Sequence, residues 1–115
     1  GQENAESAGT RQLSGIGGQM DFLEGAYRSK GGKGFICINS SRVTKDGERK
    51  SNIVAAIPSG STISAPRTMI QYVATEYGIA DLAGKSLRER AEAMAAIAHP
   101  DFREELMKYA REKFK

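Results

Sequence analysis

The 115-residue sequence has one cysteine, one histidine and no long apolar run. Cys37 cannot form an intramolecular disulfide, and its place in the apolar stretch "GFICIN" predicts a buried core thiol. His99 has no cysteine or histidine partner at ligand spacing, so no metal site is predicted. No stretch approaches the roughly 20 apolar residues that cross a bilayer, and the N-terminus lacks the pattern of a signal peptide. These absences predict a cytoplasmic protein without a metal or a membrane partner.

The sequence also lacks a strong excess of either charge. Its formal net charge is +3, and no aromatic-rich basic stripe is present, so nucleic acid is not predicted as a partner. A small polyanionic ligand held by a few Lys and Arg side chains would explain the basic excess, and so would solubility alone.

The first third of the chain predicts a loop, a helix and a strand. Residues 1–14 are polar and lack apolar periodicity, which predicts a loop. Spaced apolar residues predict a helix from Gln19 to about Arg28, which the glycines of "SKGGKG" end. The short apolar run that follows predicts a buried strand over residues 35–39.

The middle of the chain reads as extended structure. The Asp46-Gly47 pair lies between two extended segments and predicts a hairpin turn. Residues 62–65 are a candidate short strand. Residues 70–76 are rich in β-branched and aromatic side chains and predict a central strand.

The last third predicts two helices. Ser86 and Glu89 have the spacing of a capping box, and apolar residues follow at helical spacing until Pro100 ends the run. Pro100 suits the first turn of a second helix, and His99 before it suits a cap or a hinge. Strands interleaved with helices predict an α/β fold, an open layered sheet with flanking helices.

The stretch "SGIGGQMDFLEGA", residues 14–26, places three glycines directly before a predicted helix. Glycine is costly to order, so it is kept where a tight turn or the close approach of another molecule excludes a side chain. The first N–H groups of a helix lack partners and carry the positive end of the macrodipole, which suits a phosphate or an oxyanion. A turn that uses glycine for packing alone is an equal alternative. A dinucleotide fingerprint is rejected, because Met20 stands where its third glycine should be.

Other candidate residues have equally plain alternatives. Lys30 and Lys33 bracket a pair of glycines and could reach a phosphate, but an exposed turn would carry them as well. Glu76 ends a predicted strand, where open α/β sheets bind ligands, but such a carboxylate is more often solvated or paired. The P-loop-like stretch over residues 78–86 has one residue too many, and we read it as a strand-to-helix turn capped by Ser86.

Three motifs together carry a family resemblance. The stretches "GIGGQMDF", "TEYGIADL" and "IAHPDFR" resemble the C-terminal domain of the acetyl-CoA hydrolase/transferase family. Within that family the sequence is most similar to the 4-hydroxybutyrate and butyryl-CoA:acetate CoA-transferases. The resemblance covers nearly the whole chain and is weakest over residues 42–52.

The resemblance implies one CoA-transferase-like C-terminal domain, with a lead-in segment over residues 1–14 and an α/β body over residues 15–115. It implies exchange of coenzyme A between an acyl-CoA and a short carboxylic acid, with CoA as substrate and no permanently bound cofactor. A glutamate of the family attacks the thioester and then carries CoA as a glutamyl thioester. That glutamate lies upstream of the glycine cluster, and no position here matches it. The full-length protein would therefore add an N-terminal domain, and the resemblance also implies a homo-oligomer.

In this family a backbone N–H of the glycine cluster lies against the thioester carbonyl. The resemblance therefore implies that Gly17 or Gly18 donates to the oxyanion and that Gln19 begins the supporting helix. The candidate residues for binding CoA or substrate are Gly15, Gly17, Gly18, Gln19, Lys30, Lys33 and Glu76. Two alternatives stay open: an acetyl-CoA hydrolase of the same family, in which water replaces the acceptor acid, and a CoA-binding module without catalysis.

Overall fold

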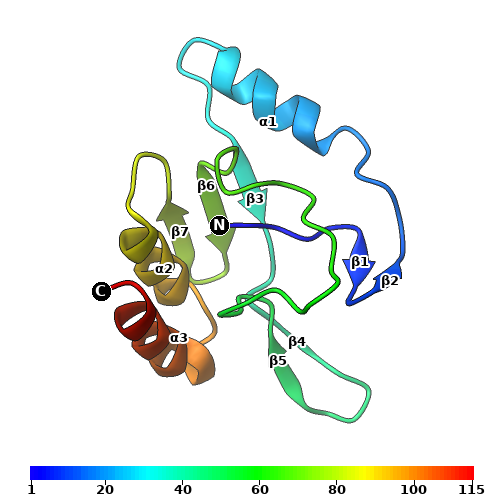
Figure 1. Ribbon diagram of the computed structural model, residues 1–115, viewed down its shortest axis with the longest axis vertical. Helices are drawn as coiled ribbons and strands as arrows, with labels where there is room; N and C mark the ends of the chain where they lie inside the picture. The colour runs from blue at the N-terminus through cyan, green and yellow to red at the C-terminus, as the bar shows by residue number, and fades with distance from the viewer.

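The computed structural model describes residues 1–115, which form a three-stranded sheet, two small hairpins and three helices (Figure 1). No helix combines the length and the apolar character needed to cross a bilayer. In chain order the elements are β1 Ser7–Ala8, β2 Arg11–Gln12, α1 Gln19–Arg28, β3 Phe35–Cys37, β4 Ser41–Val43, β5 Arg49–Ser51, β6 Tyr72–Thr75, β7 Gly78–Asp81, α2 Leu87–Ala96 and α3 Pro100–Lys113.

The sheet has the order β3-β6-β7, with β3 parallel and β7 antiparallel to β6. Strand β6 is central, as its β-branched and aromatic residues predicted. Strand β7 lies where the sequence predicts only a turn toward the next helix. The chain reverses directly after β6, and Gly78, with φ of 146°, adopts a conformation there that other residues rarely reach.

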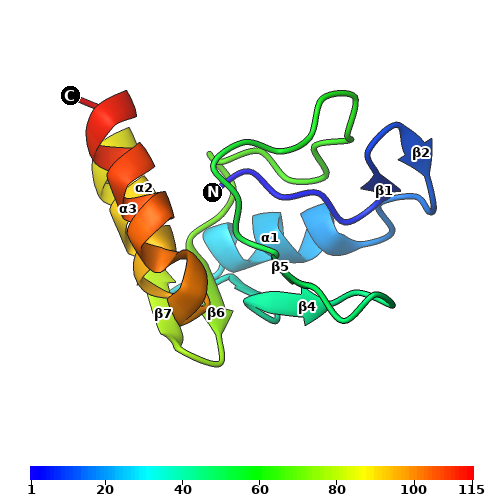
Figure 2. The same cartoon turned by 90° about the horizontal axis from the view of Figure 1, so that it is seen from below.

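Helix α2 packs on the sheet at β7, and α3 packs against α2 (Figure 2). The predicted capping box is present: Ser86 Oγ accepts from the N–H of Glu89, and the Glu89 carboxylate accepts from the N–H of Ser86. Pro100 opens α3, and His99 caps it by accepting the N–H of Asp101 at Nδ1. Both helix predictions are thus confirmed.

The core lies between the sheet, α2 and the chain segments that cross in front of them. Its buried members begin at Leu23 and include Ile97 and Ala98 between α2 and α3, while the two helices add partly buried residues such as Met94 and Leu106. The buried apolar cluster consists of Leu23, Ile53, Ala65, Ile70, Val73, Ala80, Leu82, Ile97 and Ala98.

The N-terminal segment is more ordered than its polar sequence predicted. Residues 1–14, expected as a loop, contain the short hairpin β1-β2. Glu3 forms a β-bridge with Ala65, and the N–H of Ala5 donates to Ser64 Oγ at 2.9 Å. The strand expected over residues 62–65 reduces to this single bridge, because no neighbouring strand runs beside it.

The hairpin predicted from Asp46-Gly47 is confirmed as β4-β5. Val43 faces Arg49 across it, and Gly47 has φ of 80° in the turn, as an Asp-Gly pair allows.

The prediction of a buried Cys37 is wrong, since the thiol is exposed. Phe35, on the same strand, is 46% exposed. Strand β3 is an edge strand, and the sheet face that carries these two side chains has no helix upon it.

Candidate functional site

The glycine cluster forms the loop that leads into α1, and the turn requires glycine at only one of its positions. Gly17 has φ of 60°, the left-handed region. Gly18 has φ of −91° and ψ of 10°, which other residues can adopt. A Cβ on Gly15 would meet nothing within 4 Å, and one on Gly18 would make only an ordinary contact with Phe22 at 3.7 Å. The backbone conformation therefore explains why residue 17 is glycine, but nothing within the chain requires glycine at positions 15 and 18.

The same loop presents unused hydrogen-bond donors. Gly18 is the N-cap of α1 and has no side chain to cap the helix. The N–H groups of Gly18, Gln19 and Met20 donate to no acceptor within the chain. These donors lie at the positive end of the helix macrodipole, where negative charge is stabilised. The loop can therefore hold an anionic oxygen against its backbone.

Gln19 connects the glycine loop to the N-terminal segment. Its Nε2 donates to Glu3 Oε2 at 2.6 Å. Burial raises the pKa of the Glu3 carboxyl, and the hydrogen bond from Gln19 opposes that shift. The side chain of Gln19 thus fixes the start of α1, while its N–H stays free.

Lys30 and Lys33 lie at the opposite end of α1, about 15 Å from the glycine loop as judged from the ten residues of the helix. Both are exposed, and neither forms a salt bridge or a side-chain hydrogen bond. An open groove between α1 and β3 runs between the two ends, and its lining includes Gln19, Phe22 and Lys33. Lys33 can meet a negative group that extends along this groove, whereas Lys30 lies outside its lining.

Glu76 lies elsewhere, at the carboxyl ends of β3 and β6. Its carboxylate accepts the N–H of Ser40 at 2.9 Å and the Ser40 hydroxyl in a short hydrogen bond. These bonds from Ser40, first the hydroxyl and then the N–H, lower the pKa of the Glu76 carboxyl. Glu76 is therefore ionised and paired at neutral pH, and no contact joins it to the glycine loop.

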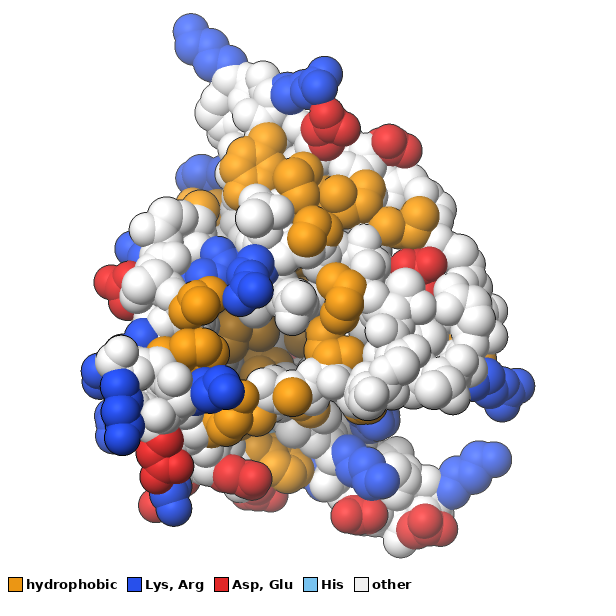
Figure 3. Space-filling view, viewed as in Figure 1, with side chains coloured by type: hydrophobic (Ala, Val, Ile, Leu, Met, Phe, Trp, Pro, Cys, Tyr) orange, Lys and Arg blue, Asp and Glu red, His pale blue; other side chains and the backbone are white.

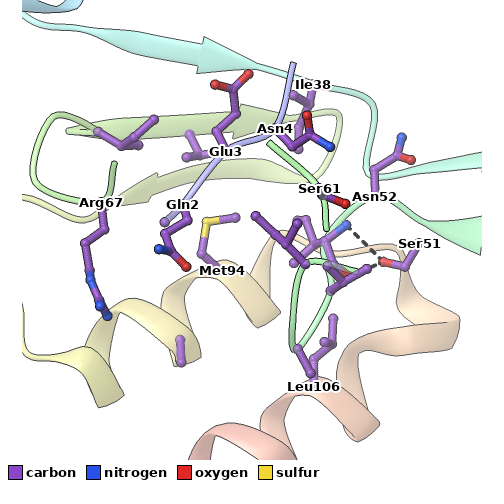
Figure 4. Close-up of a pocket in the computed structure, with 18 of the residues that line it drawn as sticks. Gln2, Glu3, Asn4, Ile38, Ser51, Asn52, Ser61, Arg67, Met94 and Leu106 are labelled. Atoms are coloured by element: carbon purple, nitrogen blue, oxygen red, sulfur yellow. Dashed lines mark hydrogen bonds between the residues drawn. The ribbon is translucent and has the colours of Figure 1, made fainter. Parts of the chain in front are cut away.

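A cavity of about 660 Å³ opens between the sheet, α2, α3 and the N-terminal segment. Apolar side chains surround the hollow at the centre of the face drawn in Figure 3. Met94 and Leu106 line one side, with Gln2 and Arg67 nearby (Figure 4). None of the residues predicted for the site lines this cavity. Its lining combines apolar side chains with polar and charged ones, among them Arg42, Asn52 and Arg67.

The model of one protein family, described as the acetyl-CoA hydrolase/transferase C-terminal domain, matches residues 1–110. The chain belongs to this family. It is 48% identical over 96% of its length to the butyryl-CoA:acetate CoA-transferase of Anaerostipes caccae, of which it covers 25%. It is 46% identical over 99% of its length to the 4-hydroxybutyrate coenzyme A transferase of Clostridium kluyveri, of which it covers 26%.

Solved structures of the family share the fold. RipA from Yersinia pestis superposes with a TM-score of 0.79 at 39% identity, over 98% of this chain and 24% of RipA. An acetyl-CoA hydrolase of Schizosaccharomyces pombe is more distant, at 31% identity over 88% of this chain and 18% of that protein. The chain thus spans about a quarter of the length of these two transferases.

Within this C-terminal domain the predicted site residues fall into two groups. The first group is the glycine loop with Gln19 at one end of α1 and the two lysines beyond its other end, with Gln19 and Lys33 lining the same groove. The second is Glu76 alone. Sequence reasoning missed Ser40, whose fully buried hydroxyl orients Glu76, because 36 residues separate the two and nothing local links them.

Sequence reasoning also missed Arg90. The side chain of Arg90 is buried and donates to the carbonyls of Leu82 at 2.6 Å and Arg67 at 2.7 Å. Burial, followed by the charge of Arg67, lowers the pKa of the Arg90 guanidinium. Because it joins the end of β7 to the segment before β6, Arg90 has a structural role. An arginine in the first turns of a charged helix gives no sequence signal of that role.

Proposed function

We propose that the full-length protein is an acyl-CoA:carboxylate CoA-transferase of the butyrate or 4-hydroxybutyrate type, and that this domain supplies its oxyanion-binding loop. The observation that carries the proposal is the glycine loop. At Gly15 and Gly18 the fold has room for a side chain, yet the sequence has glycine. Three free N–H groups stand beside them. A loop kept bare where the chain has room for side chains fits the close approach of a substrate.

The chemistry begins with a glutamate carboxylate outside this chain. Its oxygen attacks the thioester carbon, and the carbonyl oxygen becomes an oxyanion that the loop N–H groups stabilise. The C–S bond breaks, CoA leaves as a thiolate, and an acyl-glutamyl anhydride remains. The thiolate then attacks the glutamyl carbonyl and releases the acyl group as a carboxylate. The acceptor acid reverses these two steps and leaves with CoA.

Gly17 or Gly18 provides the donor at the oxyanion in this proposal, and Gln19 holds the start of α1 in place. Lys30 and Lys33 bind phosphate groups of CoA as point charges, with the ligand extending along the groove between α1 and β3. Glu76 contributes a fixed negative charge at a second edge of the substrate site. Acyl-CoA and a short carboxylic acid are the substrates, and the remaining N-terminal part of the enzyme completes the site.

Transfer is favoured over hydrolysis because the relatives near 48% identity are transferases, whereas an acetyl-CoA hydrolase lies at 31%. The test uses the full-length protein with butyryl-CoA and isotope-labelled acetate. We expect labelled acetyl-CoA, no release of free CoA in the absence of acetate, and an enzyme that gains the mass of a covalent CoA adduct. Free CoA released at the same rate without acetate would identify a hydrolase instead. If neither labelled acetyl-CoA nor a CoA adduct forms, the protein is a binding module without catalysis.

A further inference from the structure

No helix of this chain covers one face of the three-stranded sheet, although Phe35 at the edge of that face also lines the groove beside α1. Strand alternation and register place Ile36, Val73 and Ala80 toward the core, where α2 and α3 lie. The opposite side chains form two rows across the strands. We define this open sheet face as Phe35, Tyr72 and Asp81 in the first row and Cys37, Ala74 and Ile79 in the second.

The open sheet face is apolar and exposed. Ile79 is 61% exposed, Cys37 is exposed, and Phe35 stacks on Tyr72 with ring centroids 4.9 Å apart. Strands β6 and β7 lie along the lower edge of Figure 2, and no helix or strand lies below them. All-parallel sheets are covered on both faces, and an antiparallel sheet that leaves one face to water carries polar side chains there. In this mixed sheet the uncovered face is mainly apolar, so its side chains are not those of a solvated face. A contiguous apolar patch of this kind marks a surface that another element covers.

We propose that the part of the full-length enzyme outside this chain docks on the open sheet face. The matched family is a C-terminal domain, and about three quarters of the length of each relative lies outside the matched segment. Only Asp81 among the six residues is charged, which is typical of a permanent interface that resembles a divided core. Strand β3 is also an edge strand, so its backbone can extend the sheet into the same covering part. This inference does not depend on the reaction that the enzyme catalyses.

The reactivity of the Cys37 thiol measures whether another part of the protein covers the open sheet face. Full-length protein is treated with a maleimide in its native state and in denaturant, and labelling of Cys37 is followed by peptide mass spectrometry. Lys108→Cys, at an exposed position of α3, supplies a matched control thiol. We expect native Cys37 to react at least ~10-fold more slowly than this control thiol while both react alike in denaturant, because the cover excludes the reagent. Equal native rates would overturn the proposal.

The oligomeric state separates the covering part from a second copy of the chain. Labelling is repeated on dilution, with the mass in solution followed by light scattering. We expect protection of Cys37 to persist in the monomer. Protection that disappears as the oligomer dissociates would assign the face to a subunit interface and overturn the proposal.

A second variant measures the apolar contact itself. Ile79→Lys places a charge on the open sheet face, and Val43→Lys places one at a similarly exposed position of the β4-β5 hairpin. In the full-length enzyme we expect Ile79→Lys to lower the Tm by ~5 °C or more and Val43→Lys to change it by less than ~1 °C, since a charge buried at an interface is destabilising and a surface charge is not. Equal and small shifts would contradict the proposal, and the labelling of Cys37 decides the matter if Ile79→Lys does not fold.

Discussion

Substitution of Gly18 by valine tests the oxyanion loop in the full-length enzyme. The backbone of Gly18 has a negative φ in the sparsely populated bridge region, which residues with a Cβ can adopt, and its Cβ would make only ordinary contacts, the nearest with Phe22 at 3.7 Å. The fold should therefore accept valine at this position, at a cost of about 1 kcal/mol for a poorer N-cap residue. A branched side chain would nevertheless stand between the free N–H groups and an approaching thioester.

The expected loss of activity follows from the donor that becomes inaccessible. Removal of one oxyanion donor in an enzyme costs about 2.7–4 kcal/mol of transition-state stabilisation, which is roughly a 100- to 1000-fold loss of turnover. We expect Gly18→Val to lower kcat by at least ~100-fold, measured as CoA exchange between butyryl-CoA and acetate, with an unchanged circular dichroism spectrum. Gly17 is a poorer position for this test, because its φ of 60° would strain any other residue. A loss of activity could then come from backbone strain as well as from a blocked donor.

Gly25 provides the matched control within the same helix. A Cβ there would meet nothing within 4 Å, and alanine in a helix interior is more stable than glycine by roughly 1 kcal/mol. Gly25→Ala should therefore raise the Tm, and because Gly25 lines the groove between α1 and β3, it serves as a control for helix stability and not for turnover. If Gly18→Val retains turnover within a few-fold of the parent, the glycine loop is a packing turn and the assignment is wrong.

Four further predictions concern other parts of the domain. Replacement of both Lys30 and Lys33 with Gln should weaken CoA binding and flatten its salt dependence in a titration, because fewer screened ion pairs remain, whereas Lys108→Gln should change neither. Ser86→Ala should lower the free energy of unfolding by about 1 kcal/mol in a urea titration, since the capping box is lost. Because hydrogen bonds depress the pKa of Glu76 below its usual value near 4.5, its contribution to stability is present above that pH and fades as the pH falls through the lower folded pKa. Glu76→Gln should therefore flatten the acid limb of the stability curve, and an unchanged limb would contradict the pairing. The 115-residue chain alone should exchange no CoA and form no adduct in intact-mass measurements, since it lacks the attacking carboxylate; an adduct that Glu76→Gln abolishes would place the nucleophile here.

Local sequence patterns were enough to predict the elements that depend on neighbouring residues. Helix α1 spans Gln19–Arg28, as its apolar spacing predicted, and Ser86 caps α2 through Glu89. The Asp-Gly turn of the hairpin was equally readable. Each of these features is stabilised by contacts within a few residues, so the local pattern contains the physical information that forms it. The position of the glycine loop at a helix start followed in the same way.

Tertiary structure decided what depends on residues far apart in the chain. Glu76 is held by Ser40 from another strand's end, and Glu3 gives the polar N-terminal segment its place beside Ala65. Cys37 has the sequence of a core residue and lies on the surface, because burial depends on which face of the sheet receives the helices. An apolar side chain in a strand indicates that its face of the sheet packs against another element. Only the tertiary structure shows whether that element belongs to this chain.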